Sequence, residues 1–184
     1  MTTRTVLDQK LDRSFDMLDT DQDGHIREED LISLASRLSS AFDSHSLSVV
    51  ARLEGAFAAL WDIDLIPMDT AHKGSIDREE WRAGVRKAVA TDRSGFLGRM
   101  NTMLRAWLEL CDTDDDGWLN REQFITMYGR TLGLRQEKLE VAFTMLDTDG
   151  DGAISLNQVC HAVEEYYTSE EPDTPGNWLF GPLR

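Results

Sequence analysis

Apolar residues recur every three or four positions through most of the chain, in stretches separated by short segments that contain few of them. Leu7, Leu11, Phe15 and Leu18 share one face if residues 7–18 form a helix. This spacing predicts amphipathic helices, and their apolar faces predict ordinary helix core. Equivalent stripes are Leu31/Leu34/Ala35/Leu38, Leu47/Val50/Leu53/Phe57/Leu60/Trp61, Trp81/Val85/Val89, Met103/Leu104/Trp107/Leu110, Phe124/Met127/Tyr128, Leu139/Ala142/Phe143/Leu146 and Val159/Ala162/Val163/Tyr166.

Three of the intervening polar segments are copies of one repeat. They begin DTDQDG at residue 19, DTDDDG at residue 112 and DTDGDG at residue 147. Each copy has Asp at positions 1, 3 and 5, Gly at position 6 and an aliphatic residue at position 8. Each also has an amphipathic stretch on both sides, so the sequence predicts a repeated helix-loop-helix unit.

A fourth, eroded copy lies between the first two. In its best register, residues 69–80, it keeps Gly74, Ile76 and Glu80 at positions 6, 8 and 12. Positions 3 and 5 are Ala71 and Lys73, which cannot ligate a cation. Residues 62–68 are interpreted as an insertion ahead of this loop, which accounts for the wider spacing of the loops in the first half of the chain.

The three intact loops have the ligand pattern of a calcium site. Calcium takes six to eight oxygen ligands, supplied in a 12-residue loop by positions 1, 3, 5 and 12 and by the carbonyl of position 7, with a glycine at position 6 for the sharp turn. We expect about three calcium ions. The predicted ligands are Asp19, Asp21, Asp23, His25 and Asp30; Asp112, Asp114, Asp116, Trp118 and Gln123; and Asp147, Asp149, Asp151, Ala153 and Gln158.

Position 12 departs from the usual glutamate in all three loops. Asp30 is one methylene shorter than Glu and favours a smaller cage, so magnesium is expected to compete in the first loop. Gln123 and Gln158 each offer one neutral oxygen, which predicts weaker calcium binding in the third and fourth loops. Arg27, at position 9 of the first loop, is expected to point outward.

These motifs, with the silent second loop, resemble the calerythrin-like and sarcoplasmic calcium-binding protein family, whose members have four EF hands; the similarity is to the bacterial type and covers nearly the whole chain. The resemblance implies a compact globule, sites in hands one, three and four, and a role in calcium buffering or signalling. The predicted class is all-α, with four EF-hand helix-loop-helix units in two pairs.

The predicted organisation has four parts. Residues 1–90 hold the first pair, in which hand 1 is intact and hand 2 degenerate; residues 91–98 are a connector rich in turn-forming residues; residues 99–168 hold hands 3 and 4. Residues 169–184 are a tail whose Trp178, Leu179 and Phe180 are expected to dock on the protein's own hydrophobic cleft. Within each pair, the position-8 residues predict a short strand contact, Ile26 with Ile76 and Leu119 with Ile154.

The formal net charge of −15 disfavours nucleic acid and anionic membranes as partners. No apolar run is long enough to span a membrane or to form a signal peptide, and the two cysteines suggest no disulfide framework, so a monomeric cytoplasmic protein is expected. No motif for a nucleophile or a phosphate-binding loop is present, and the acidic residues are accounted for by the loops. An enzyme is therefore not predicted.

Three functions remain open from the sequence. The first is a cytoplasmic calcium buffer or transporter. The second is a calcium sensor that exposes a hydrophobic groove to a helix of a target protein. The third is a small-molecule binding module, as in the EF-hand photoproteins, in which a closed globule encloses a ligand.

Overall fold

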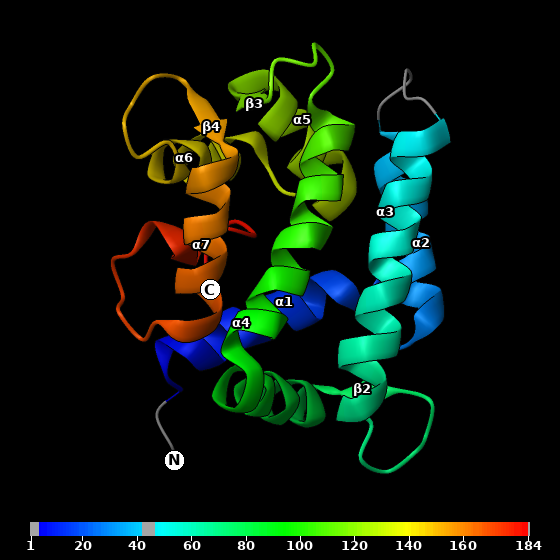
Figure 1. The fold of residues 1–184 in the computed structure, drawn as a ribbon. Coiled ribbons are helices and arrows are strands. Elements are labelled where there is room, and N and C mark those ends of the chain that lie inside the picture. The colour runs from blue at the N-terminus through cyan, green and yellow to red at the C-terminus, as the bar shows by residue number, and fades with distance from the viewer. Residues whose placement is uncertain (1–3, 42–46, 184) are drawn as a thin grey trace.

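The structure is a computed structural model, and it describes residues 4–41 and 47–183. It confirms the all-helical class: the described residues form seven α-helices, and two very short antiparallel strand pairs lie at opposite ends of the molecule (Figure 1). The elements are α1 (Val6–Leu18), β1 (His25–Ile26), α2 (Glu28–Ser40), α3 (Leu47–Leu60), a π-helical turn (Trp61–Leu65), a 3-10 turn (Ile66–Met68), β2 (Ile76–Asp77), α4 (Arg78–Cys111), β3 (Trp118–Asn120), α5 (Arg121–Leu132), α6 (Gln136–Leu146), β4 (Ala153–Ser155), α7 (Leu156–Thr168) and a 3-10 turn (Pro175–Trp178).

The strand pairs join the loops of each half of the molecule. β1 pairs with β2 in a register that places Ile26 opposite Ile76, and β3 pairs with β4 so that Leu119 lies opposite Ile154. Both contacts are those predicted from position 8 of the repeat. These side chains are buried, so each pair of loops is held together over the core by its aliphatic residues.

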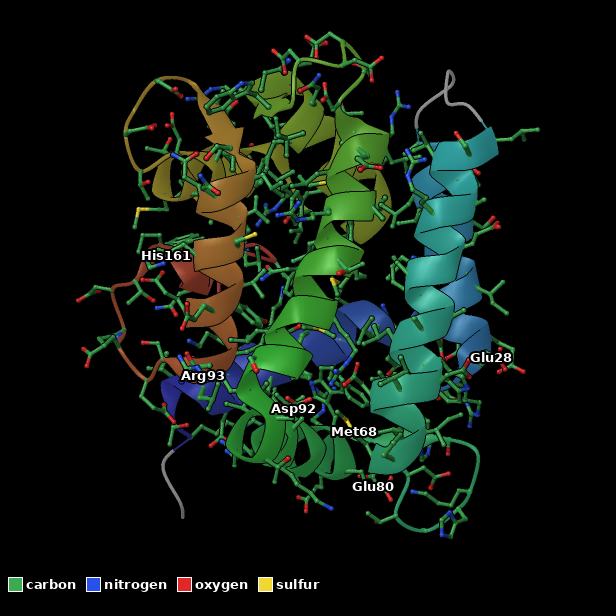
Figure 2. All side chains as sticks on the ribbon, viewed as in Figure 1. Glu28, Met68, Glu80, Asp92, Arg93 and His161 are labelled. Carbon is green, nitrogen blue, oxygen red and sulfur yellow. The ribbon has the colours of Figure 1, made fainter. Side chains whose placement is uncertain are left out.

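The helical segment α4 joins the two halves and consists of two helices that meet at a kink. Its first part leaves the second loop and its second part enters the third, and it bends at Asp92, whose backbone (φ −147°, ψ 60°) is not helical (Figures 1 and 2). The Asp92 carboxylate accepts a hydrogen bond from the Gly95 N–H at 3.1 Å and so caps the second part of the helix. Residues 91–98 are otherwise helical, which the turn-forming residues of this connector did not indicate.

The residues interpreted as an insertion continue helix α3 as two further helical turns. Residues 61–65 make a π-helical turn and residues 66–68 a 3-10 turn. Asp64, in the π turn, is buried and accepts hydrogen bonds from Arg99 of α4, with an Nε–Oδ2 distance of 2.8 Å. Met68 packs against α4 at Gly84, where a Cβ would lie 2.3 Å from the Met68 Cγ (Figure 2). The insertion therefore anchors α3 to α4.

The apolar tail residues lie within the core. Leu179 and Phe180 are buried, and the Phe180 ring meets the Tyr166 ring edge to face at 5.0 Å. The Phe180 carbonyl accepts a hydrogen bond from Arg13 Nε at 2.9 Å, and the Leu179 carbonyl accepts one from the Tyr128 hydroxyl. The tail thus contacts α1, α5 and α7, and connects the first helix of the chain to the C-terminal half.

Candidate metal centres

All four loops wrap around the carboxylate at position 1. In loop 1 the Gly24 N–H donates to Asp19 Oδ2 at 3.0 Å, and in loop 3 the Gly117 N–H donates to Asp112 Oδ2 at 2.8 Å. Loop 4 has the same bond at 3.0 Å, and the degenerate loop 2 has it at 2.6 Å. The position-6 glycines have φ between 72° and 91°, a conformation that is strained for residues with a Cβ. The glycine is therefore what allows the chain to close around this carboxylate.

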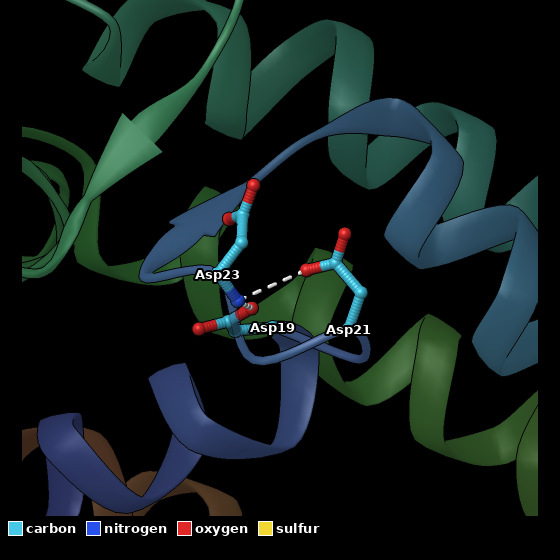
Figure 3. Close-up of side chains that lie close together, drawn as sticks. All are labelled: Asp19, Asp21 and Asp23. Carbon is cyan, nitrogen blue, oxygen red and sulfur yellow. Dashed lines mark hydrogen bonds between the residues drawn. The ribbon is translucent and has the colours of Figure 1, made fainter.

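Three groups of aspartates converge within these loops. Each of Asp19/Asp21/Asp23, Asp112/Asp114/Asp116 and Asp147/Asp149/Asp151 has ligand oxygens within 4.8 Å of one another. Figure 3 shows the first group. Like charges at this separation repel, and a divalent cation would relieve that repulsion. Burial raises the pKa of the Asp19 carboxyl, and neighbouring Asp30 and Asp21 add to the effect. Burial likewise raises the pKa of Asp112, with a contribution from the neighbouring carboxylates.

The position-7 residues lie in the short strands, one in each intact loop. His25, Trp118 and Ala153 donate their backbone N–H groups to the position-5 carboxylates at 2.9, 2.8 and 3.0 Å. These bonds fix the backbone next to the acidic groups. Ligation by their carbonyl oxygens stays a prediction.

Asp30, at position 12 of loop 1, lies in the first turn of α2 and contacts the loop from there. Asp30 is buried, and its Oδ1 accepts hydrogen bonds from the N–H and the hydroxyl of Thr20 at 3.0 and 2.8 Å. Its Oδ2 accepts the N–H of Arg27 at 2.9 Å. The carboxylate thus links the beginning of the loop to the first turn of the helix that leaves it.

The two position-12 glutamines are oriented by similar bonds. Gln123 Oε1 accepts the Asn120 N–H at 2.8 Å, while its Nε2 donates to Asp114 Oδ1 at 2.8 Å. Gln158 Oε1 accepts the Ser155 N–H at 2.6 Å, while its Nε2 donates to Asp149 Oδ1 at 3.1 Å. Each amide therefore presents its NH₂ group, which cannot ligate a cation, to the position-3 carboxylate. An ion ligated by either glutamine requires that amide to turn over.

Arg27 lies at the surface of loop 1, where its side chain pairs with an acidic residue of the same loop. Its NH1 forms an ion pair and a hydrogen bond with Asp23 Oδ2, four residues earlier in the chain. The bond from Arg27 holds the pKa of Asp23 below its usual value. The cause is local, since positions 5 and 9 of the loop face each other and an unpaired carboxylate at position 5 attracts the nearest cation.

In loop 2 a lysine ammonium contacts the acidic groups. Lys73 Nζ lies 2.9 Å from Glu80 Oε2 and 3.2 Å from Asp77 Oδ2. Burial alone would raise the pKa of Glu80, and hydrogen bonds from Lys73, the Asp77 N–H and Thr70 outweigh it and lower that pKa. The Lys73 pKa is raised, chiefly by its bond to Glu80. From the sequence, Lys73 was interpreted only as a residue that cannot ligate a cation. The acids at positions 9 and 12 were the signal that it also forms ion pairs within the loop.

The comparisons with known proteins agree with this arrangement. The family model for an EF-hand domain pair matches residues 100–164, and that for a single EF hand matches residues 11–35. Calerythrin from Saccharopolyspora erythraea is 23% identical over 167 residues, which cover 90% of this chain and 94% of calerythrin.

Two solved structures share the fold over nearly their whole length. A calcium-binding protein from Streptomyces coelicolor, described in the context of prokaryotic calcium-mediated regulation, superposes with a TM-score of 0.75 at 26% identity, covering 88% of this chain and 98% of that one. A sarcoplasmic calcium-binding protein from amphioxus superposes with a TM-score of 0.76 at 22% identity, covering 97% and 98%. The chain therefore contains EF-hand units in both halves, and over most of its length it is similar to calerythrin and to the sarcoplasmic calcium-binding proteins.

Proposed function

We propose that the chain is a cytoplasmic calcium buffer that binds three ions, in loops 1, 3 and 4. The convergence of three aspartates in each of these loops carries the proposal. The ligands are the five residues named above for each loop. An ion in each loop would compensate carboxylates that otherwise repel one another, and it would reduce the strongly negative charge of the whole chain.

The three sites differ in expected affinity. Loop 1 supplies four carboxylates, Asp19, Asp21, Asp23 and Asp30, and is expected to hold its ion best, with magnesium competing because Asp30 is short. Loops 3 and 4 supply three carboxylates and a glutamine. Their calcium dissociation constants are expected at the weak end of the range, on the order of 10⁻⁵–10⁻⁴ M.

A buffer fits the C-terminal half better than a sensor does. In EF-hand sensors calcium exposes a hydrophobic groove. Here Leu179 and Phe180 of the tail fill the space between the helices, and the remaining cavity beside Leu179 is about 20 Å³. A cavity of this size holds at most about one water molecule, so an enclosed organic ligand is disfavoured as well.

Among the described residues no helix is long and apolar enough to cross a membrane.

Calcium titration by calorimetry, with and without magnesium, tests the proposal. We expect three ions per chain, one of which is weakened by millimolar magnesium while the other two are little affected. Because the proposal includes no catalytic step, binding itself is the readout. Failure of calcium to bind, or equal competition by magnesium at every site, would contradict the assignment.

A further inference from the structure

In each pair of loops, an arginine of one loop reaches the helix that enters the other loop. Arg78 and Arg121 both occupy position 10, in loops 2 and 3, and each is the first residue of the helix that follows its loop. Arg78 contacts α1, which enters loop 1, and Arg121 contacts α6, which enters loop 4. Neither arginine is among the predicted ligands.

Arg78 holds the last turns of α1. Its guanidinium carbon lies 4.4 Å from the centre of the Phe15 ring, and its Nη2 donates to Asp16 Oδ1 at 2.5 Å. Its Nη1 donates to the Asp12 carbonyl at 3.1 Å. The Phe15 ring is buried, and the Phe15 carbonyl accepts the N–H of Asp19, the first predicted ligand, at 2.8 Å. Arg78 therefore packs on the residue that fixes the backbone where the metal site begins.

Arg121 makes an equivalent contact in the C-terminal half. Its guanidinium carbon lies 4.7 Å from the centre of the Phe143 ring, and its Nη1 donates to Glu140 Oε2 at 2.5 Å. Phe143 is buried, and its carbonyl accepts the N–H of Asp147, the first predicted ligand of loop 4, at 2.9 Å. Phe143 and Phe15 lie at the same place in the repeat, four residues before the first aspartate.

The short strands fix the other side of each arrangement. The residue directly before Arg78 lies in β2, opposite His25 at position 7 of loop 1. The residue directly before Arg121 lies in β3, opposite Ala153 at position 7 of loop 4. Each arginine thus connects two predicted ligand positions of the neighbouring loop. It reaches position 1 through the phenylalanine and position 7 through the strand pair.

Loop 3 has a different arrangement at the same place. Its partner, loop 4, has Leu156 at position 10, and the residue four before the first aspartate of loop 3 is Leu108. Leu108 and Leu156 line a cavity of about 140 Å³. Glu109, three residues before the first aspartate, pairs with Arg52 of α3 at 2.9 Å. Loop 3 is therefore an internal comparison for loops 1 and 4.

We propose that Arg78 and Arg121 are positioning residues for the metal centres of the neighbouring loops, Arg78 for loop 1 and Arg121 for loop 4. The inference rests on the proposed calcium sites and adds residues outside their ligand sets. It also gives a role to the hand whose own loop is silent, because hand 2 supplies Arg78. Groups that orient the ligands of a metal contribute to its affinity without touching the ion.

Positioning and simple electrostatics predict opposite effects when these arginines are removed. Each arginine is a positive charge near a cation site. By charge alone, Arg78→Met and Arg121→Met would tighten calcium, because the chain becomes more negative. Loss of a contact that holds the entering helix against the strand weakens calcium at that loop instead. The sign of the change therefore separates the two explanations.

The test is a calcium titration of the full chain followed by NMR at the Gly24, Gly117 and Gly152 amides, each of which donates to the first carboxylate of its own loop. Arg121→Met is expected to weaken calcium about tenfold at loop 4, and to weaken loop 3 less, although Arg121 itself belongs to loop 3. Arg78→Met is expected to weaken loop 1 about tenfold as well.

The ion-free chain gives a second readout. In chelator, the Asp19 amide should exchange its hydrogen faster in Arg78→Met, and the Asp147 amide should do so in Arg121→Met, because the last bond of each entering helix is less well held. Arg121→Lys keeps the charge next to Glu140 and should recover part of the affinity of loop 4.

Arg93→Met is the matched control. It removes a similarly exposed ion pair, with Glu164, beside the bend of α4 (Figure 2), and it should weaken none of the three loops. Melting curves in chelator verify folding. Arg121 is half exposed, so Arg121→Met decides the test even where Arg78→Met does not fold.

Three results would overturn the proposal. The first is three ions in the native chain with unchanged or tighter binding at loops 1 and 4 in the methionine variants, which would leave the calcium sites standing. The second is equal weakening of every loop by Arg121→Met, the mark of a general loss of structure. The third is a native chain whose glycine amides do not shift with calcium, which would remove the calcium sites as well.

Discussion

Loop 2 and the C-terminal loops fail to match the usual calcium-binding pattern in opposite ways. Loop 2 keeps a glutamate at position 12, Glu80, and lacks acids at positions 3 and 5. Loops 3 and 4 keep the acids at positions 3 and 5 and have glutamine at position 12. In loop 2 the Lys73 ammonium lies 2.9 Å from Glu80, whereas in loop 3 the Gln123 amide donates to Asp114 at 2.8 Å.

The difference shows how an EF-hand loop can be closed without a metal. In loop 2 the positive charge that the carboxylates contact is the ammonium of Lys73, a residue of the loop itself. The loop therefore needs no ion. In loops 3 and 4 a neutral NH₂ group contacts one of three carboxylates and leaves the others uncompensated. Since β1 and β2 join loops 1 and 2, the self-closed loop can support its partner at any calcium concentration.

Among the predictions that follow from this comparison, removal of calcium is expected to have the largest effect, a fall in the melting temperature. An ion at about 100 times its dissociation constant stabilises the native state by about 2.7 kcal/mol, and 1 kcal/mol corresponds to about 2–4 °C in a domain of this size. Three sites, two of them weak, predict a fall in melting temperature of about 10 °C or more on chelation. A calorimetric melt with and without millimolar calcium measures it; an unchanged melting temperature would mean that the loops are empty.

Restoring the missing acids should convert loop 2 into a fourth site. The variant Ala71→Asp/Lys73→Asp places carboxylates at positions 3 and 5 next to the existing Asp69 and Glu80. We expect four bound ions instead of three, with the new site in the range of sensor loops, about 10⁻⁷–10⁻⁵ M. Lys73→Met alone removes the ammonium without adding a ligand and should still bind three. A double variant that remains at three ions would show that more than ligand identity silences the loop.

Gln123→Glu and Gln158→Glu should tighten calcium at their own loops. Each adds a charge and a second ligand oxygen, and each removes the NH₂ group that now faces the position-3 carboxylate. A gain of about 1–3 kcal/mol, roughly 5- to 150-fold in affinity, is expected. Gln136→Glu, on the exposed surface of α6, is the matched control. Native loops that already bind below about 10⁻⁷ M, with no gain from glutamate, would refute the argument from position 12.

The smallest expected effect is in the titration of the carboxyl groups in the ion-free protein. Burial raises the pKa of Asp19 and Asp112, while the Lys73 and Gly74 N–H groups lower that of Asp69 and the Glu80 N–H lowers that of Asp77. A raised folded pKa means that Asp19 and Asp112 favour the fold more as pH falls toward that value. A lowered pKa means that Asp69 and Asp77 support the fold above their unfolded pKa and lose that support as pH falls through the folded one.

Carboxyl carbon NMR through a pH titration should therefore show Asp19 and Asp112 protonating before Asp69 and Asp77 as the pH is lowered. Lys73→Met should move the pKa of Asp77 and Glu80 upward, because it removes a cation that each carboxylate contacts. Its effect on Asp19 should be small. The reverse order of protonation in the native chain would show that the loops do not differ in their charge compensation.

The parts of the fold that the sequence predicted depend on local geometry. Gly at position 6 and an aliphatic residue at position 8 fix the turn and the strand contact within one loop, so the pairing of Ile26 with Ile76 followed directly. The helical conformation of the residues after Asp92 did not follow, because it depends on Phe96. Phe96 is buried, and the centroid of its ring lies 5.4 Å from that of Tyr167 in α7. This tertiary contact favours a helical conformation and outweighs the turn-forming tendency of the neighbouring residues.

The features of the site that the sequence did not predict involve side chains with several possible hydrogen-bond or ion-pair partners. Arg27 and Lys73 have long side chains, and the loop positions they reach could not be read from their spacing alone. The orientation of Gln123 and Gln158 is likewise set by a backbone N–H three residues earlier, which donates to the oxygen of the glutamine amide. Which partner each side chain contacts can be determined only when the positions of the donors and acceptors in the folded chain are known.

The amide resonances of the four position-6 glycines test the central claim most directly. Each donates to the position-1 carboxylate of its own loop, so each reports the occupancy of one loop. In a calcium titration followed by NMR, the Gly24, Gly117 and Gly152 amides should shift and reach their end points at three ions per chain, while the Gly74 amide keeps the bond and loop it already has and shows no saturating shift. A saturating shift of Gly74 with a fourth ion, or no shift of the other three, would contradict the account.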